Sequence, residues 1–262
     1  VVERGLEKQM EREVLFQFQA KHEHVVDLIW FFEDEFIIYC LLEFADEGQL
    51  FAYLRDQDRG VPEPRAAQFF VDTARGVEYL HSLSIAHRDI KPENIMLFTK
   101  ALRAKLADLG WCVQLTAEAP TRTTFCGTLD YMAPEMISEE PHDTSVDLWA
   151  LGVLLYEMLM ASAPFAAKSP KMARDLICAV KYEIPPGSMS QGPRDLIASL
   201  LVLDRCARAS LFQVLHHRWV VTLGGSSTAS IASVSKDPMD ATREGIRPAA
   251  PECSDQTLLM EA

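Results

Sequence analysis

Apolar and polar residues alternate along the chain with two different periods, which predicts a mixture of helices and strands. Across residues 5–21, apolar positions recur at helical spacing from Leu6 to Phe18, and this pattern predicts a helix. Residues 25–32 and 36–44 are apolar and rich in β-branched or aromatic side chains, with an acidic stretch between them. We therefore expect two antiparallel strands joined by a tight turn.

Helical periods predominate farther along the chain. Residues 64–83 place apolar side chains on one face, which predicts a long amphipathic helix. Short β-like runs at residues 95–98 and 102–107 predict a hairpin that turns at Thr99 and Lys100. Further helices are expected at residues 144–160, 171–180 and 192–203. The pattern shows no internal repeat and indicates an α+β fold that becomes mainly helical.

The composition narrows the class of protein. Of the 262 residues, 48% are hydrophobic and 24% are charged, which is ordinary for a globular protein with a sizeable core. The longest apolar run, residues 148–160, contains Glu157 and is too short to cross a bilayer. No signal-peptide pattern opens the chain. The six cysteines form no CxxC pair, which favours reduced thiols in a cytosolic or nuclear protein.

The charge and the C-terminal composition add two expectations. The net charge is −13 and no dense run of lysine or arginine occurs, which disfavours direct binding to nucleic acid. We expect no membrane partner. Residues 222–262 contain no aromatic residue and many Ser, Ala, Pro and acidic residues. We predict that this tail is disordered, because it cannot bury enough apolar surface to offset the entropy of ordering it.

Three sequence blocks in a fixed order carry the chemistry. HRDIKPEN, from His87 to Asn94, is followed by DLG at residues 108–110 and by APE at residues 133–135. This order is typical of the catalytic loop, the metal-binding turn and the substrate-loop anchor of a protein kinase. A single HRD tripeptide would be a weak signal, whereas the complete ordered set is a strong one.

The residue types in these blocks suit phosphoryl transfer, which needs a group for the hydroxyl proton, a metal clamp and cations near the phosphates. Asp89 would accept or orient the proton of the incoming hydroxyl, and Lys91 would approach the transferred phosphate. Asn94 and Asp108 supply the hard oxygen ligands that Mg²⁺ prefers. We therefore expect ATP and Mg²⁺ as cofactors.

Several conspicuous residues also have structural explanations. An isolated histidine is more often a core residue than a functional one, and His87 is expected to be mainly structural. Asp147 would be either an ordinary N-cap acid or an acceptor for the backbone of the catalytic loop. Arg208 would be either a solvated surface base or the partner of Glu135. The kinase interpretation favours the second role for both Asp147 and Arg208.

Longer blocks resemble the Aurora family of serine/threonine protein kinases. They are DLGW at residues 108–111, RTTFCGTLDY at residues 122–131, and HD at residues 142–143 shortly before VDLW. The resemblance runs from about Gly5 to Trp219. Polo-like and AGC kinases share the CGT tripeptide but usually diverge after it, so another serine/threonine kinase family is a less favoured alternative.

The resemblance implies a two-lobed protein kinase fold. Residues 1–44 would form part of the N-lobe, with helix C and two strands, and residues 45–221 the mainly helical C-lobe, followed by the tail. No Gly-x-Gly-x-x-Gly occurs, and the only lysines before the hinge are Lys8 and Lys21. We therefore expect an N-lobe truncated before helix C. The sequence is either a fragment of an active kinase, which the intact catalytic set favours, or a catalytically inactive binding module.

The resemblance also assigns residues of the nucleotide site. Glu13 would be the helix C glutamate that pairs with the phosphate-binding lysine, and Gln17 lies one turn later. Leu42 would be the gatekeeper and Met96 the pocket floor, although composition alone favours plain core packing for both. The residues expected around the nucleotide are Glu43, Phe44, Ala45, Glu93, Asn94, Met96 and Asp108, of which Glu43 and Ala45 would bind adenine through the backbone.

Thr124 resembles the activating phosphorylation site of the family. A phosphate there would pair with Arg88 and order the surrounding loop. Arg122 gives the site the Arg-x-Thr form expected of an Aurora substrate, so we expect autophosphorylation in trans. Cys126 lies in the same loop, where an unremarkable thiol is favoured over a redox target.

The resemblance finally implies substrates and setting. Glu93 would bind an arginine at the −2 position of substrates such as histone tails. Thr128 would hydrogen-bond Asp89 and Lys91 and favour serine or threonine over tyrosine. The implied role is in mitosis and chromosome segregation, with an activating scaffold protein that docks on the N-lobe. The implied location is the nucleus and cytoplasm, at the spindle, centrosome or kinetochore.

Overall fold

A computed structural model describes residues 14–34 and 37–224, with only the backbone described at residue 101. Residues 14–19 are helical and form the end of the helix expected at residues 5–21. Glu13, which the resemblance assigns to helix C, lies outside the described residues, as does the chain from residue 225 onward.

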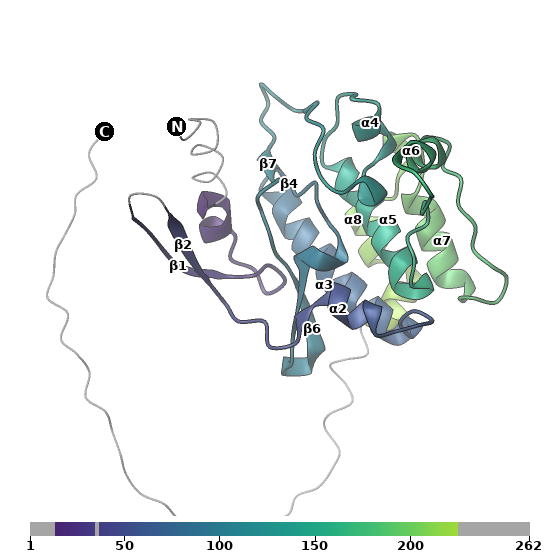
Figure 1. The fold of residues 1–262 in the computed structure, drawn as a ribbon, viewed down its shortest axis with the longest axis horizontal. Coiled ribbons are helices and arrows are strands. Elements are labelled where there is room, and N and C mark those ends of the chain that lie inside the picture. The colour runs from purple at the N-terminus through teal and green to yellow at the C-terminus, as the bar shows by residue number, and fades with distance from the viewer. Residues whose placement is uncertain (1–13, 35–36, 225–262) are drawn as a thin grey trace, which may run out of the picture. The chain divides into compact units, whose positions relative to one another are not determined.

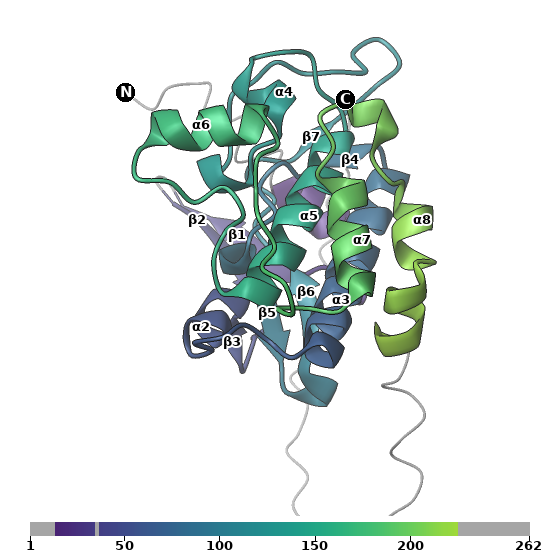
Figure 2. The same ribbon diagram turned by 90° about the vertical axis from the view of Figure 1, so that its right-hand side faces the viewer.

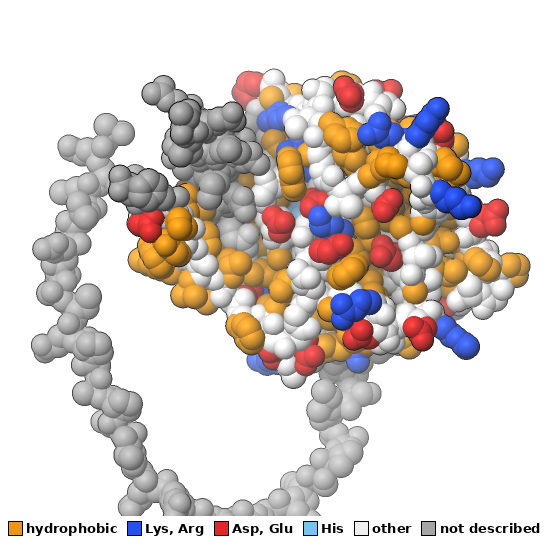
Figure 3. Space-filling model, viewed as in Figure 1, with side chains coloured by type: hydrophobic (Ala, Val, Ile, Leu, Met, Phe, Trp, Pro, Cys, Tyr) orange, Lys and Arg blue, Asp and Glu red, His pale blue; other side chains and the backbone are white. Residues whose placement is uncertain are grey.

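The first sheet is the predicted antiparallel hairpin. It consists of β1 (Leu28–Glu33) and β2 (Ile38–Leu42). Each strand is shorter than the apolar run that predicts it. Phe32 lies opposite Tyr39, and their rings stack at 4.7 Å. Apolar side chains remain exposed on both strands, including Trp30 at 63% and Leu41 at 56%, and they form the orange cluster over the hairpin in Figure 3. Two strands alone are too few to cover both of their faces, which accounts for this exposed apolar surface.

Short strands frame the catalytic segments. β3 (Gly48–Gln49), β5 (Ile95–Phe98) and β6 (Arg103–Leu106) form an antiparallel sheet in the order β3-β5-β6, and β4 (Ile85–Ala86) pairs with β7 (Val113–Gln114). The β5–β6 hairpin is the predicted one, although it turns through a 3₁₀ segment at Lys100–Leu102. The three two-residue strands were not predicted, because two residues are too few to show a period.

Helices make up most of the remainder (Figures 1 and 2). The described helices are α2 (Leu50–Arg55), α3 (Glu63–Ser82), α4 (Pro134–Ile137), α5 (Ser145–Met160), α6 (Pro170–Cys178), α7 (Gln191–Leu200), α8 (Leu211–Leu215) and a π-helical turn at Val220–Gly224. The longest ones, α3 and α5, coincide with predicted helices and pack against each other. The last turn ends three residues beyond the expected C-lobe boundary at residue 221.

The core lies around α5, which is buried on nearly all sides. Trp149 is fully buried and stacks on Phe165 at 5.4 Å. Gly152 lets α7 approach closely, since a Cβ atom there would lie 2.9 Å from the side chain of Leu200. No described helix is long and apolar enough to cross a bilayer, and none of the five described cysteines forms a disulfide.

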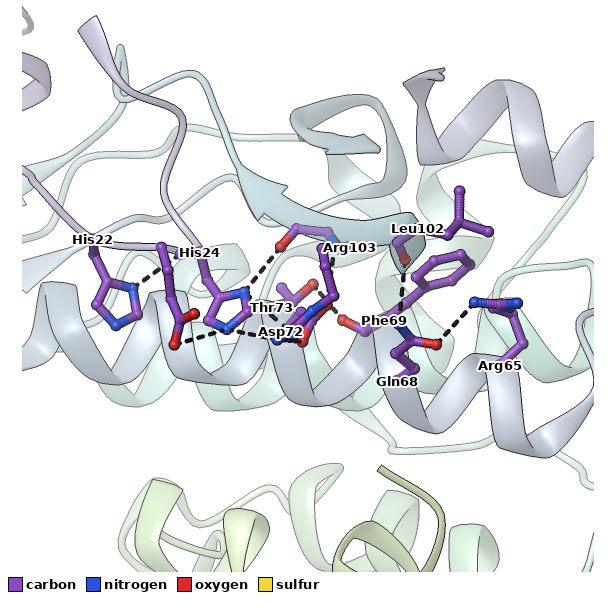
Figure 4. A network of polar contacts seen from close by, with 11 residues as sticks. His22, His24, Arg65, Gln68, Phe69, Asp72, Thr73, Leu102 and Arg103 are labelled. Atoms are coloured by element: carbon purple, nitrogen blue, oxygen red, sulfur yellow. Dashed lines mark hydrogen bonds and ion pairs between the residues drawn. The ribbon is translucent and has the colours of Figure 1, made fainter. Parts of the chain in front are cut away.

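A buried polar network fastens the segment before β1 to α3 (Figure 4). Arg103 binds both carboxylate oxygens of Asp72 on α3 at 2.8 Å. Its Nη2 also donates to Nε2 of His24 at 3.1 Å. The other ring nitrogen of His24 therefore carries the proton and donates to the carbonyl oxygen of Ala104 at 3.2 Å. His24 is 1% exposed, so it is buried as a neutral side chain.

Acid is expected to destabilise the fold through His24. Burial is the largest cause of its lowered pKa, and the charge of Arg103 adds to it against those of Asp72 and Glu23. Because the folded pKa lies below the ordinary value of about 6.5, the unfolded chain binds the proton first as pH falls. The free energy of unfolding should then drop by up to about 1.4 kcal/mol per pH unit for this histidine.

Urea unfolding between pH 7.5 and pH 5 measures this loss, and His24→Gln should make the pH slope shallower. His216→Gln just after α8, which changes an exposed histidine, is the matched control and should keep the wild-type slope. An equal slope in both variants would show that His24 does not contribute.

Candidate active site

The catalytic loop connects β4 to β5, and one buried carboxylate holds its backbone. Asp147 on α5 is fully buried. It accepts hydrogen bonds from the amides of His87 at 2.9 Å and Arg88 at 2.8 Å, and from Nε2 of His81 at 2.8 Å. Burial alone would raise the pKa of Asp147, but these partners hold it below the ordinary value. The structure therefore places Asp147 under the loop rather than at an exposed helix end.

His87 supports the loop from its other side. Its ring is buried and contacts the carbonyl oxygen of Ala107 through Nε2 at 3.1 Å, while Nδ1 accepts from the amide of Asp89 at 3.3 Å. Nε2 is therefore the protonated nitrogen of a neutral ring. Burial is the main reason that the pKa of His87 is lowered. These contacts are structural, as expected from the sequence.

Asp89 lies at the centre of a polar cluster. Its members come from the catalytic loop and from the activation segment, which is the stretch from DLG to APE at residues 108–135. It is 3% exposed. Its Oδ2 is 2.8 Å from Nζ of Lys91 and accepts from Nδ2 of Asn94 at 2.9 Å. Its Oδ1 accepts from the amide of Thr128 at 3.1 Å and from the hydroxyl at 3.2 Å. Lys91 also donates to the Thr128 hydroxyl at 2.8 Å. The carboxylate is therefore held in one orientation.

Unusual backbone conformations bring these segments together. Arg88 and Asp108 both have positive φ angles, 67° and 60°, and such conformations cluster at functional sites. Gly127 has a φ of +89°, and a Cβ atom there would lie 2.7 Å from the carbonyl oxygen of Arg88. Only glycine lets the activation segment approach the catalytic loop so closely.

A cavity of about 360 Å³ is lined in part by Asn94, which hydrogen-bonds Asp89. Of the predicted nucleotide-site residues, Glu93, Asn94, Met96 and Asp108 line it, together with Gln17 and Leu42. It is also lined by Val14, Leu28, Cys40, Gln49 and Ala107, and no functional signal in the sequence marks these residues. Four of them are ordinary core types and Gln49 is an ordinary polar residue, so only the fold shows that they face a cavity.

The other residues expected around the nucleotide, Glu43, Phe44 and Ala45, do not line this cavity. The carboxylate of Glu43 binds Nζ of Lys105 at 2.6 Å and accepts from the amide of Asp27 at 2.8 Å. Phe44 is 85% exposed. The carbonyl oxygen of Ala45 accepts from the amide of Gly48 at 3.2 Å. The binding of adenine by the backbone of Glu43 and Ala45 stays a prediction from the resemblance.

Asn94 and Asp108 fit a magnesium ion by their chemistry. Both line the same cavity. The amide nitrogen of Asn94 is engaged by Asp89 at 2.9 Å, which leaves its amide oxygen as the metal-binding atom. Asp108 offers a carboxylate, one oxygen of which accepts from the amide of Gly110 at 3.1 Å. Two hard oxygen donors on the lining of one cavity suit Mg²⁺.

Comparison with known proteins identifies the family. The protein kinase domain family matches residues 2–220. Aurora/IPL1-related protein kinase 2 of Caenorhabditis elegans is 39% identical over 216 residues, which cover 82% of this chain and 69% of that protein. An Aurora kinase of Patiria pectinifera is 39% identical over 82% of this chain and 52% of its own length. One of Schizosaccharomyces pombe is 41% identical over 87% and 63%.

The chain belongs to the Aurora family of protein kinases. This confirms the resemblance and the expected fold class, with few N-lobe strands among the described residues and a helical C-lobe. Its class is that of ATP-dependent protein kinases. The chain spans from about half to 69% of the length of these relatives.

In this Aurora-family chain the activation segment exposes Thr124. Nη2 of Arg122 donates to the carbonyl oxygen of Gln114 at 2.8 Å, and its Nη1 to that of Ala119 at 2.8 Å. Cys126 is 4% exposed, and burial raises the pKa of its thiol. A buried, protonated thiol is a poor nucleophile, which agrees with the expectation of an unremarkable cysteine.

Sequence reasoning missed an acidic group beside Glu93. Glu157 on α5 accepts a hydrogen bond from the hydroxyl of Tyr131. Burial is the largest cause of its raised pKa, to which the nearby charges of Glu93 and Asp130 add. The signal was present in the sequence, since Glu157 is the one charged residue in the apolar run at residues 148–160.

Glu135 and Arg208 form a buried ion pair that joins α4 to the segment before α8. The two guanidinium nitrogens of Arg208 lie 2.6 and 2.7 Å from the two oxygens of Glu135. Arg208 also donates to the carbonyl oxygens of Val202 at 2.9 Å and Ser145 at 3.0 Å. Its exposed fraction is 5%. The pair therefore anchors the end of the activation segment to the C-lobe.

Proposed function

We propose that this protein is an ATP- and Mg²⁺-dependent serine/threonine kinase that phosphorylates sites with a nearby basic residue. The observation that carries the proposal is the cluster of Asp89, Lys91 and Thr128 beside a cavity lined by Asn94 and Asp108. Transfer of phosphate from ATP to an Arg-x-Ser peptide tests it. A protein that binds peptide and ATP but transfers no phosphate would be a non-catalytic binding module instead.

The proposed chemistry follows from the positions of the side chains. Asp89 would accept the proton of the incoming hydroxyl, with its second oxygen held by Lys91 and Asn94. Lys91 would place its charge near the transferred phosphate. The contact of Thr128 with both residues would orient a short aliphatic hydroxyl. Bound Mg²⁺, held by Asn94 and Asp108, would neutralise charge on the phosphates.

The acidic group formed by Glu93, Asp130 and Glu157 supports recognition of an arginine at the −2 position. Several carboxylates close together attract a guanidinium, which binds carboxylates through paired hydrogen bonds. Glu157 is largely buried, so a guanidinium that reached it would interact more strongly than one at an exposed acid.

Glu157→Gln should therefore raise KM for an Arg-x-Ser peptide roughly tenfold, which corresponds to a lost charged hydrogen bond of about 1.5 kcal/mol. The turnover number should change little, because the group does not touch the reacting atoms. Steady-state kinetics with matched Arg-x-Ser and Ala-x-Ser peptides measures this. Equal effects on the two peptides would rule out arginine recognition by Glu157.

Thr124→Val is expected to abolish activation. Valine keeps the size of threonine but removes the hydroxyl that receives phosphate, so the charge of Arg88 gains no anionic partner. Incubation with ATP followed by a peptide assay should show no rise in activity. Thr123→Val, which alters the neighbouring exposed threonine, is the control and should activate normally. Unchanged activation of the Thr124 variant would contradict the assignment.

The family also supports a proposed biological setting. The relatives named above are Aurora kinases, and we infer a role in mitosis with histone tails among the substrates. A scaffold protein would activate the kinase by binding the N-lobe. The proposed location is the nucleus and cytoplasm, at the spindle, centrosome or kinetochore.

A further inference from the structure

Two buried nitrogen atoms near the activation segment belong to residues that interact electrostatically, since the charge of Arg88 lowers the pKa of His142. They are Nη1 of Arg88 and Nε2 of His142, and neither has a hydrogen-bond partner among the described residues. His142 is only 1% exposed. Its other ring nitrogen, Nδ1, contacts the carbonyl oxygen of Glu140 at 3.2 Å. Buried polar atoms without partners are costly, so a pair of them in one region points to a ligand.

The backbone on either side of Thr124 is tied to both Arg88 and His142. Two residues before it, Arg122 pairs with His142 through two backbone hydrogen bonds of 2.9 and 2.8 Å. Three residues after it, Gly127 lies against the catalytic loop, where a Cβ atom would be 2.7 Å from the carbonyl oxygen of Arg88. Two residues span at most about 7 Å and three at most about 11 Å. The backbone of Thr124 therefore stays within that reach of the backbones that contact His142 and Arg88, while its side chain remains exposed to an incoming kinase.

We propose that Arg88 and His142 together form the binding site for a phosphate on Thr124, with Nε2 of His142 donating one of the hydrogen bonds. The proposal rests on the proposed activation through Thr124 and adds His142 as a positioning residue. Arg88 uses Nε to bind the carbonyl oxygen of Trp111 at 2.9 Å, which leaves Nη1 to donate to the phosphate. Such charge-assisted hydrogen bonds are about twice as strong as neutral ones.

The site binds phosphate and a proton together. Because Nδ1 of His142 faces a carbonyl oxygen and can only donate to it, Nε2 carries a hydrogen only when the ring is charged. Without phosphate, burial lowers the pKa of His142, with Arg88 adding to this effect and Glu135 and Asp143 opposing it. A phosphate brings about −1.5 to −2 charge, which raises this pKa. Stabilisation by phosphate is therefore greatest at lower pH and declines as pH rises through the raised pKa.

The test uses protein that carries phosphothreonine at position 124, introduced during synthesis, beside unmodified protein. We expect NMR titration of the His142 ring to show a pKa higher by at least about one unit in the phosphorylated protein. The increase in melting temperature caused by phosphorylation should be larger at pH 6.5 than at pH 8.5. In His142→Gln, whose amide donates without titrating, the excess at pH 6.5 should be lost. Only the titration of the phosphate then remains, with a second pKa of about 6, and it favours the higher pH.

His216→Gln just after α8 is the matched control and should behave as the wild type. An unchanged His142 titration after phosphorylation, or an unchanged pH difference in His142→Gln, would overturn the proposal. Should the glutamine variant fail to fold, the titration of wild-type His142 decides the question alone. None of these readouts needs kinase activity, so phosphorylation that shifts His142 without activating the enzyme would contradict the proposed function and leave this inference standing.

Discussion

Asp89→Asn is expected to lower kcat for an Arg-x-Ser peptide by roughly 10²–10⁴, the usual contribution of a positioned proton acceptor. Asparagine has nearly the same shape, and its amide oxygen still accepts from the amide and hydroxyl of Thr128 as Oδ1 does now. It cannot take a proton from the substrate hydroxyl. It also removes the charge that pairs with Lys91 at 2.8 Å. The variant should therefore bind ATP and peptide but transfer phosphate slowly.

Single-turnover transfer from labelled ATP, combined with binding constants for ATP and peptide, separates chemistry from binding. Asp56→Asn, which alters an exposed acid at the end of α2, is the control and should keep the wild-type rate. A fully active Asp89 variant would remove Asp89 from the catalytic role. A wild-type protein that transfers no phosphate, with both substrates bound, would favour the binding module.

The elements and residues that could be predicted are those with a recognisable pattern in consecutive residues. The helices α3 and α5 are long enough to show several turns of one period, and the ordered HRDIKPEN, DLG and APE blocks define the chemistry before any geometry is known. The role of Asp147 could also be predicted, because its position within the VDLW block distinguishes it from an ordinary N-cap residue. All of these blocks can be recognised from consecutive residues alone.

Features that depend on packing between residues far apart in the sequence could not be predicted. Val14 and Cys40 have side chains typical of any core, and only the approach of the helix at residues 14–19 to β2 makes them line the cavity. The two-residue strand β4 exists because β7 lies beside it. Likewise, His142 is 54 residues from Arg88 in sequence, and no local pattern relates the two.

The largest loss of stability is expected from Arg208→Met. The substitution leaves the carboxylate of Glu135, which is 7% exposed, without the guanidinium that binds both of its oxygens. Breaking a buried ion pair on one side typically costs about 3–5 kcal/mol, because the remaining charge stays buried without compensation. The variant also lacks the hydrogen bonds that Arg208 donates to the carbonyl oxygens of Val202 and Ser145. It loses as well the cation–π contact of the guanidinium, which lies 5.2 Å from the centre of the Trp149 ring.

Chemical denaturation of Arg208→Met and of the double variant Glu135→Leu with Arg208→Met separates charge from packing. The double variant should be more stable than the single one, since no buried charge remains without a partner. Arg55→Met is the control: it breaks the exposed contact with Asp56 and should change stability by less than about 1 kcal/mol. A loss below about 1 kcal/mol in Arg208→Met would show that water reaches Glu135 when its partner is removed. Glu135 would then hold the activation segment through packing and the backbone of α4 instead of through the charge of Arg208.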